Sequence, residues 1–206
     1  SFLEKVFYAE DFREWAMSIS EIDYSNLGRE ESRMVIPFYD TEGNLIAAQG
    51  RALGSHELRY ITVKVSEESL KVYGLERWNS ESTTYIVEGP IDSMFLPNCL
   101  AVAGGDLQSI KINKEMCVLI FDNEPRNEHT VKKLMKAIDD GWEVVVWPKQ
   151  FEFSELRDMY KMKKFKDIND LVMNGLSIDE ILRIINKNTM KGLKANWAAR
   201  KWRNVH

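Results

Sequence analysis

The sequence contains very little cysteine, which argues against both a disulfide framework and a zinc site. Only Cys99 and Cys117 occur among the 206 residues, and each lies in an apolar run. We expect two buried, reduced thiols in a cytosolic protein, because disulfides are rare in that compartment. A structural zinc site needs four ligands at short spacings, and the two cysteines and three scattered histidines form no such cluster. The sequence therefore predicts no zinc in this chain.

Long apolar runs and the common nucleotide-binding motifs are also missing. No apolar run approaches the roughly 18–20 residues of a membrane span, and the first residues, SFLEKVFYAEDFREW, are too acidic for a signal peptide. The patterns GxxxxGK[ST], GxGxxG and GxSxG do not occur, which argues against a P-loop motor, a dinucleotide-binding enzyme and an α/β-hydrolase. We expect a protein without a membrane partner that resides in the cytoplasm.

The charges are slightly acidic overall but unevenly distributed. A formal net charge of -4 argues against a protein that nucleic acid coats over its whole surface. Cations nevertheless cluster in two places. Residues 187–206 contain six Lys or Arg and no acid, and YKMKKFK, residues 160–166, contains four lysines. A local phosphate-binding surface therefore remains compatible with the composition.

The pattern of apolar residues predicts an α/β fold in four segments. Residues 1–28 are expected to form an amphipathic helix and a linker. Residues 29–80 read as a small β-rich unit, with a hairpin around DTEG and a third strand at RYITVKV. In residues 81–186, strands that are apolar throughout alternate with helices, which is typical of a mainly parallel sheet covered on both faces. Residues 187–206 are expected to be a basic helical tail.

Acidic residues follow the predicted strands of the parallel sheet at three places. The pairs are Glu88 with Asp92, Asp122 with Glu124, and Asp167 with Asp170. Parallel strands bring their carboxyl ends to one edge, so we expect these side chains to converge there. Clustered carboxylates repel each other unless cations lie among them, and hard oxygen ligands suit Mg²⁺ or Mn²⁺, here two ions. The alternative is that they are solvated charges or, for Asp92 and Asp167, helix-terminal acids.

The segments VEGPIDSMF, FDNEPRN and KDINDLV together resemble the Toprim domain, the metal-binding α/β module of bacterial-type primases, topoisomerases and some nucleases. The upstream segments QGRAL, RYITV and KVYGLERW resemble the small subdomain that precedes Toprim in bacterial and bacteriophage replicative primases. The similarity is greatest to the T-even-type bacteriophage primases and extends from about Met34 to Gly175. It implies a Toprim domain after a small β-rich subdomain.

The resemblance also implies roles for the acids. Glu88 matches the Toprim glutamate, which assists proton transfer or metal binding at the attacking 3′-hydroxyl. Asp122 matches the first acid of the Asp-x-Asp motif, a metal ligand, and Glu124 stands where the family has a second Asp. Asp92 and Asp167 match acids that complete the metal site. Asp170 matches less well, because the family acid falls one residue earlier.

Basic residues are expected to bind nucleotide or nucleic acid. Arg51, Arg59 and Lys71 match positions of the upstream subdomain that face phosphates, and the alternative is that they are solvated surface charges. Lys166 and Arg126 flank the acids in sequence and are expected to contribute to the same binding. Arg126 could instead pair with one of the acids.

The resemblance implies the RNA polymerase core of a DNA primase, a nucleotidyltransferase that makes short RNA primers on single-stranded DNA for phage replication. Its substrates would be ribonucleoside triphosphates, its partner a replicative helicase, and its location the host cytoplasm. The zinc-binding module usual in such primases is missing, so we expect a catalytic fragment. The alternatives are a Toprim nuclease, for which the same metals would serve, and a non-catalytic replisome adaptor. The tail would track single-stranded DNA, dock on the helicase, or pack Trp197 and Trp202 on its own domain.

Overall fold

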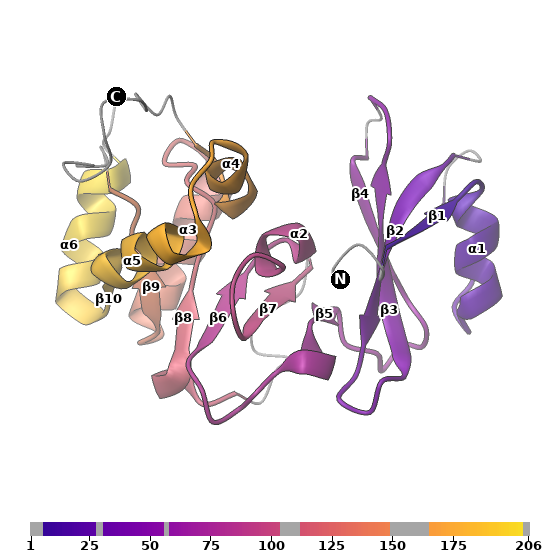
Figure 1. Ribbon diagram of the computed structural model, residues 1–206, viewed down its shortest axis with the longest axis horizontal. Coiled ribbons are helices and arrows are strands. Elements are labelled where there is room, and N and C mark those ends of the chain that lie inside the picture. Colours follow the sequence, from indigo (N-terminus) through magenta and orange to yellow (C-terminus); the bar gives the residue numbers. More distant parts are fainter. Residues whose placement is uncertain (1–5, 28–30, 56–57, 104–111, 149–164, 204–206) are drawn as a thin grey trace.

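The computed structural model describes residues 6–27, 31–55, 58–103, 112–148 and 165–203. These residues form two β-sheets, one of four strands and one of six. Figure 1 shows the sheets side by side, with the four-stranded sheet and α1 at one end of the molecule and the six-stranded sheet with its helices at the other. Within the described ranges, none of the helices has the length and apolar character needed to cross a membrane.

The four-stranded sheet is antiparallel throughout, in the order β1-β2-β3-β4. Its strands are β1 (Phe7–Ala9), β2 (Arg33–Tyr39), β3 (Leu45–Ala52) and β4 (Tyr60–Lys64). At the turn between β2 and β3, the Asp40 carboxylate accepts hydrogen bonds from the backbone N–H groups of Glu42 and Asn44. Gly43 has a φ of 88°, which costs glycine little. The hairpin and the third strand predicted from the sequence are confirmed.

The two faces of this sheet contact different partners. On one face, Val35, Ala48 and Val63 are buried against Phe12 of α1 (Phe12–Ile19). Successive residues of a strand point to opposite faces, so Ile36 and Phe38 lie on the other side. They belong to the main core, and the Phe38 ring meets Tyr73 edge to face at 5.4 Å between centroids. The two units therefore share one hydrophobic core where they meet.

The six-stranded sheet has the order β10-β9-β8-β6-β7-β5. Its strands are β5 (Val72–Tyr73), β6 (Thr84–Val87), β7 (Cys99–Val102), β8 (Cys117–Leu119), β9 (Glu143–Val145) and β10 (Thr189–Met190). The strands β9, β8, β6 and β7 run parallel, and the two edge strands run antiparallel to their neighbours. The sequence-based prediction of a mainly parallel sheet is confirmed.

Helices cover both faces of this sheet (Figure 1). They are α2 (Pro90–Ser93), α3 (Glu128–Asp139), α4 (Ile168–Met173), α5 (Ile178–Asn188) and α6 (Gly192–Arg203). The connection from β6 to β7 moves one way along the sheet and that from β8 to β9 moves the other way. Because such crossovers are right-handed, α2 and α3 lie on opposite faces. α4 contacts α2 and α5, whereas α6 packs against α3.

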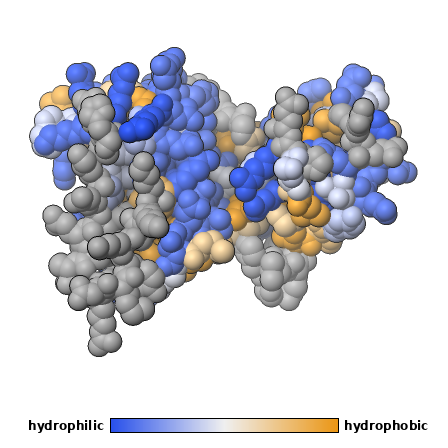
Figure 2. All heavy atoms as spheres, turned by 90° about the horizontal axis from the view of Figure 1, so that it is seen from above, coloured by the Kyte–Doolittle hydropathy of each residue, from blue (hydrophilic) through white to orange (hydrophobic). Residues whose placement is uncertain are grey.

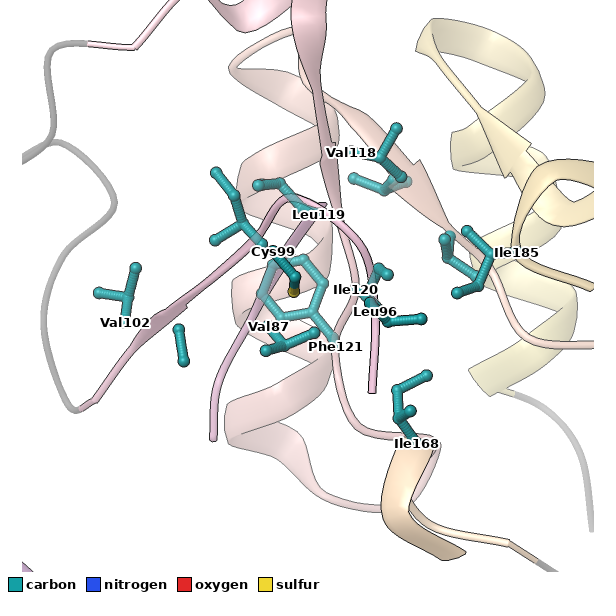
Figure 3. Close-up of a cluster of buried hydrophobic side chains, with 14 of the residues drawn as sticks. Val87, Leu96, Cys99, Val102, Val118, Leu119, Ile120, Phe121, Ile168 and Ile185 are labelled. Carbon is teal, nitrogen blue, oxygen red and sulfur yellow. The ribbon is translucent and has the colours of Figure 1, made fainter. Parts of the chain in front are cut away.

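The core between these layers comes from the apolar strands. Figure 3 shows side chains of this core, among them Val87 and Leu119 of the central strands, Ile168 of α4 and Ile185 of α5. Cys99, also in this core, and Cys117 are both buried free thiols, as the sequence predicted. Burial on both faces explains why the strand sequences are apolar throughout rather than alternating.

Three short strands were not predicted from the sequence. β1 precedes α1 where only a helix and a linker were expected, and β10 lies in the predicted helical tail. β5 pairs with β7, so residues 29–80 contribute strands to both sheets. These strands have two or three residues each, too few to show the alternation that identifies a strand in a sequence.

The tail after α5 packs partly on the domain. The side chain of Trp202 in α6 is only 6% exposed, whereas that of Trp197 is 62% exposed. The Lys201 ammonium group lies 3.5 Å from the centroid of the Trp197 ring. Packing on the chain's own domain, one of three alternatives for the tail, therefore holds for Trp202.

Candidate active site at the carboxyl ends of the parallel strands

Two acidic residues flank the point at which the strand order reverses. β7 lies on one side of β6 and β8 on the other, so the boundary between β6 and β8 is the switch point of the sheet. Open α/β sheets bind their ligands in the crevice at this point, outside the carboxyl ends of the strands. Glu88 is the first residue after β6, and Asp122 follows β8 after two further apolar residues.

Glu88 has one paired and one unpaired carboxylate oxygen. Its Oε2 accepts a hydrogen bond from the Lys133 ammonium group of α3 at 3.3 Å. Its Oε1 is buried and has no hydrogen-bond partner among the described residues. A buried polar atom without a partner is costly, and in native proteins such an atom often faces an ordered water or an ion.

Asp92 connects the helices on one face of the sheet. Its Oδ1 accepts a hydrogen bond from the backbone N–H of Asn169 in α4 at 2.9 Å. Burial raises the pKa of Asp92 to about 7; the hydrogen bond opposes this shift, and the negative charges of Asp167 and Asp122 add to it. The Asp92 carboxyl group therefore changes its charge close to neutral pH.

The ammonium group of Lys166 lies between the carboxylates of Asp122 and Glu124. Lys166 Nζ is 3.1 Å from Asp122 Oδ2 and 3.6 Å from Glu124 Oε1. Burial raises the pKa of Asp122 against the opposing effect of this ammonium group. Burial would lower the pKa of Lys166, but the neighbouring carboxylates outweigh it and raise that pKa. The other oxygen of Glu124 accepts hydrogen bonds from Asn127 and Thr130 at the start of α3.

Asn123, between the two acids, holds three segments together. Its backbone N–H donates to the carbonyl of Lys166 at 2.6 Å, and its side-chain amide donates to the carbonyl of Phe165 at 3.1 Å. Its side-chain oxygen accepts a hydrogen bond from the indole N–H of Trp202 at 2.8 Å. The acidic loop is therefore fixed both to the segment that enters α4 and to α6.

Asp167 caps α4, and Asp170 in the first turn of this helix bonds back to the residue before the cap. Asp167 is the N-cap of α4, and its carboxylate accepts a hydrogen bond from the backbone N–H of Asp170 at 2.8 Å. The Asp170 carboxylate accepts one from the backbone N–H of Lys166 at 2.9 Å. Such bonds satisfy N–H groups at a helix start, the alternative considered for Asp167. The charge of Asp167 also raises the pKa values of Asp92 and Asp122, so Asp167 lies near both.

We call the five acids that the structure gathers at this place the acidic edge: Glu88, Asp92, Asp122, Glu124 and Asp167. Their oxygens are the hard donors that Mg²⁺ and Mn²⁺ prefer, and the unpartnered oxygen of Glu88 is available to an ion. As the side chains stand, however, no three His, Cys, Asp or Glu residues of the described ranges are grouped so that they could hold a metal ion. The ammonium groups of Lys133 and Lys166 lie against the carboxylates instead. The donor chemistry fits a divalent ion, which would compete with these lysines.

Two of the predicted phosphate-binding residues lie together on the four-stranded sheet. Arg51 is the cross-strand partner of Tyr60, so both side chains project from one face. The guanidinium carbons of Arg51 and Arg59 lie 5.9 and 5.6 Å from the centroid of the Tyr60 ring. Met34, opposite Arg51 on β2, packs on the main core, so this face turns toward the six-stranded unit. Figure 2, in which the molecule is seen from above, shows its outline narrowing between the two units.

The other predicted basic residues lie on different elements. Lys71 is half-buried just before β5, and its backbone carbonyl accepts a hydrogen bond from Ala103. Arg126 is exposed in the turn after Glu124, and within the described ranges the cation that pairs with Glu124 is Lys166. Of the lysine-rich segment YKMKKFK, only the last two residues are described; residues 160–164 lie outside the described ranges.

Sequence reasoning missed several residues of this site. Lys133 lies on α3 among other charged residues, so nothing distinguishes it from a solvated helix lysine. Tyr60 was assigned only to a strand, although an aromatic residue directly after Arg59, a predicted phosphate-binding position, is a usable signal. The link between Asn123 and Trp202 spans 79 residues of sequence and leaves no local pattern.

Comparison with known proteins relates the chain to DNA primases. No family model matches the sequence. Over 198 residues the chain is 33% identical to the DNA primase of Enterobacteria phage T4; the match covers 93% of this chain and 54% of that protein, so the chain spans about half of its relative. Two primase domains are among the solved structures that share the fold. The E. coli primase catalytic core has a TM-score of 0.52 at 17% identity, covering 79% of this chain and 56% of that one. The RNA polymerase domain of Mycobacterium tuberculosis primase DnaG, in complex with double-stranded DNA, has a TM-score of 0.57 at 15% identity, covering 91% and 69%.

Proposed function

We propose that this relative of the phage T4 primase, which has the fold of a primase catalytic core, is itself the RNA polymerase core of a DNA primase. It would synthesise short RNA primers on a single-stranded DNA template from ribonucleoside triphosphates. The observation that carries the proposal is the acidic edge at the switch point of a Toprim-type sheet, together with the arginines on the neighbouring sheet.

The chemistry of primer synthesis requires groups of the kinds found here. Joining two ribonucleotides needs a deprotonated 3′-hydroxyl, a neutralised triphosphate and a stabilised pyrophosphate leaving group. Glu88 has a buried carboxylate oxygen that is free to accept a proton or bind an ion. Asp122 and Glu124 present further carboxylates beside it, with Asp92 and Asp167 behind them. We infer that these five residues would hold Mg²⁺ or Mn²⁺.

When bound, such ions would neutralise phosphate charge and stabilise the attacking and leaving oxygens. The chain's own cations would position the substrates. Arg51 and Arg59 lie on the face that turns toward the six-stranded unit, where they would contact phosphates of template or nucleotide. We assign Lys71, Arg126 and Lys166 to the same task. Asp170, whose carboxylate is occupied by the backbone N–H of Lys166, is the weakest of the predicted ligands.

Partners and location follow from the same proposal. Single-stranded DNA is the template, and a replicative helicase is the proposed neighbour in the replisome. A zinc-binding module supplied separately would select the initiation sequence. Synthesis would take place in the cytoplasm of the host cell.

The test uses this chain, single-stranded DNA, labelled ribonucleotides and either Mg²⁺ or Mn²⁺, with a zinc-binding module added in a second series. Supercoiled plasmid is incubated in parallel. Oligoribonucleotides whose formation depends on template and metal support the proposal. Nicked plasmid without oligoribonucleotides indicates a Toprim nuclease, for which the same acids would serve. Neither product, with the module present, contradicts both activities and favours an adaptor.

A further inference from the structure

The loop that carries Asp122 and Glu124 has almost no regular structure of its own. Residues 120–127 lie between β8 and α3 and form no helix or strand. Something other than a strand ladder must therefore fix where the two carboxylates point. The hydrogen bonds of Asn123, directly between them, do this across long sequence separations.

Asn123 sets the register between the acidic loop and the segment that enters α4. The backbone N–H of Asn123 donates to the carbonyl of Lys166, and its side-chain amide donates to the preceding carbonyl, that of Phe165. These two hydrogen bonds hold the two segments side by side in one register. The Lys166 ammonium group then lies against the carboxylates on either side of Asn123. A slip of this register would move the lysine and the acids relative to each other.

Trp202 fixes the orientation of the Asn123 side chain from the other face of the sheet. Its buried indole donates to Asn123 Oδ1, so the amide nitrogen is the end that points to Phe165. The helix α6 is itself anchored by its packing on α3 and by Lys191, which pairs with Glu115 at 2.8 Å. The position of the acidic loop therefore depends on a residue 80 positions further along the chain than Asp122.

We propose that Asn123 and Trp202 act as a pair of positioning residues for Asp122, Glu124 and Lys166, which makes α6 part of the active site rather than a peripheral tail. The inference rests on the proposed function for the reaction that the site catalyses. The hydrogen bonds that fix the acidic loop are independent of that function. Neither residue needs to touch substrate. Displacement by a fraction of an ångström is sufficient to slow a reaction that depends on aligned groups.

The experiment is a double-mutant cycle with Asn123→Ala and Trp202→Phe in the full chain. Trp202→Phe keeps an aromatic ring in the core and removes only the N–H donor. We expect primer synthesis to slow about tenfold or more in each variant, with the Michaelis constant for ribonucleotides rising much less than kcat falls, because Arg51 and Arg59 on the other sheet are left in place. The double variant should be no slower than the slower single variant, because both remove the same link.

A readout independent of activity is the binding of Mn²⁺ alone, followed by electron paramagnetic resonance. The dissociation constant should rise at least about threefold in both variants, again without additivity in the double variant. Trp197→Phe, an exposed tryptophan on the same helix, is the matched control and should leave both measurements unchanged. If Trp202→Phe does not fold, Asn123→Ala, in a half-buried loop outside the helices and strands, carries the test with Asn196→Ala as its control.

Multiplicative effects in the double variant, or wild-type rates and Mn²⁺ binding in the single variants, would overturn the proposal. A loss of synthesis accompanied by an equal rise of the Michaelis constant would also overturn it, since that pattern indicates general damage to binding. If the unmodified chain makes no primers, the proposed function fails, but the Mn²⁺ cycle still decides whether the pair positions the acids.

Discussion

The ammonium group of Lys166 lies 3.1 Å from a carboxylate oxygen of Asp122 and forms the closest counter-charge that the described chain gives this acid. The same group reaches Glu124. Both acids are proposed to bind a divalent ion, so the lysine occupies oxygens that the ion would need. A divalent ion would therefore have to displace the Lys166 ammonium group from these two carboxylates.

Replacing this lysine is expected to tighten metal binding. In Lys166→Met the two carboxylates lose a positive charge within 4 Å. Coulomb interactions of this size are worth on the order of 1 kcal/mol or more in partly buried sites, so Mn²⁺ should bind about tenfold more tightly to the free protein. Isothermal titration of the protein with Mn²⁺ measures the change.

The control for this prediction is Lys136→Met on α3. Lys136 pairs with Asp140 at 2.6 Å on the surface, away from the acidic edge, and its loss should not change Mn²⁺ affinity. Unchanged or weaker binding in Lys166→Met would show that the lysine does not compete with the ion.

Glu88→Gln tests the residue at the switch point. The amide can still accept a hydrogen bond from Lys133 but can neither take up a proton nor bind an ion strongly. We expect primer synthesis to fall at least about a hundredfold, which is the usual size of a general-base or metal-ligand contribution. The unfolding temperature should stay close to that of the unmodified chain. Rates of synthesis in steady state, with thermal unfolding followed alongside, give both values.

Glu128→Gln provides the comparison for this substitution. Glu128 is exposed on α3 and pairs only loosely with Lys132, at 3.8 Å. This variant should keep full activity. Retained synthesis in Glu88→Gln would remove that residue from the mechanism.

Asp92 should make stability depend on pH in the metal-free protein. Its pKa of about 7 lies above the ordinary aspartate value of 3.8, so the folded state holds a proton that the unfolded state has lost. Between about pH 4 and pH 7, the folded state binds more protons, and the free energy of unfolding therefore falls as the pH rises through this window. The loss is on the order of 4 kcal/mol at most, and above pH 7 the contribution levels off.

Asp92→Asn removes this titration but keeps the acceptor for the Asn169 N–H. Urea unfolding with a chelator at pH 5 and pH 8 should show a larger free energy of unfolding for the variant at pH 8 and a smaller difference between the two pH values. Equal pH dependence in both proteins would mean that Asp92 is not the responsible group.

Phe38→Ala probes the shared core between the two units. Phe38 is fully buried and meets Tyr73 across the boundary between the sheets. Truncation of a buried phenylalanine costs about 3–5 kcal/mol in the free energy of unfolding, which urea titration will register. The exposed Phe7, truncated in the same way, should cost less than about 1 kcal/mol. A small effect at Phe38 would indicate that the units fold without support from each other.

The parts predicted well from the sequence are those with long, repeated patterns. The apolar runs that end at Glu88 and Asp122 correctly predicted parallel strands. A strand buried on both faces is apolar at every position, whereas a strand with one exposed face alternates between apolar and polar residues. A serine before a run of apolar residues at helical spacing is a recognisable helix start, and at Ser177 the structure has a full capping box with Glu180. The placement of acids on one edge then followed from the direction of the strands alone.

The parts that the sequence did not reveal depend on contacts between distant segments. Lys133 and Trp202 have ordinary local surroundings, and their importance comes from partners 45 and 79 residues away. The role of Asp167 shows the same limit: the sequence allowed a metal ligand or a helix cap, and the structure shows the cap while leaving the acid near Asp92.

Arg59→Ala should weaken the binding of single-stranded DNA mainly through charge. Arg59 lies beside the exposed ring of Tyr60, on the unit that is proposed to hold the template. A contact between one cation and one phosphate of a single strand contributes about 0.7 to the slope of log affinity against log salt concentration. The slope for oligo(dT), measured by fluorescence anisotropy between low and moderate salt, should therefore become shallower by about that amount. Lys132→Ala, on the exposed side of α3, should leave this slope unchanged. An unaltered slope in Arg59→Ala would show that Arg59 does not contact a phosphate of the single strand.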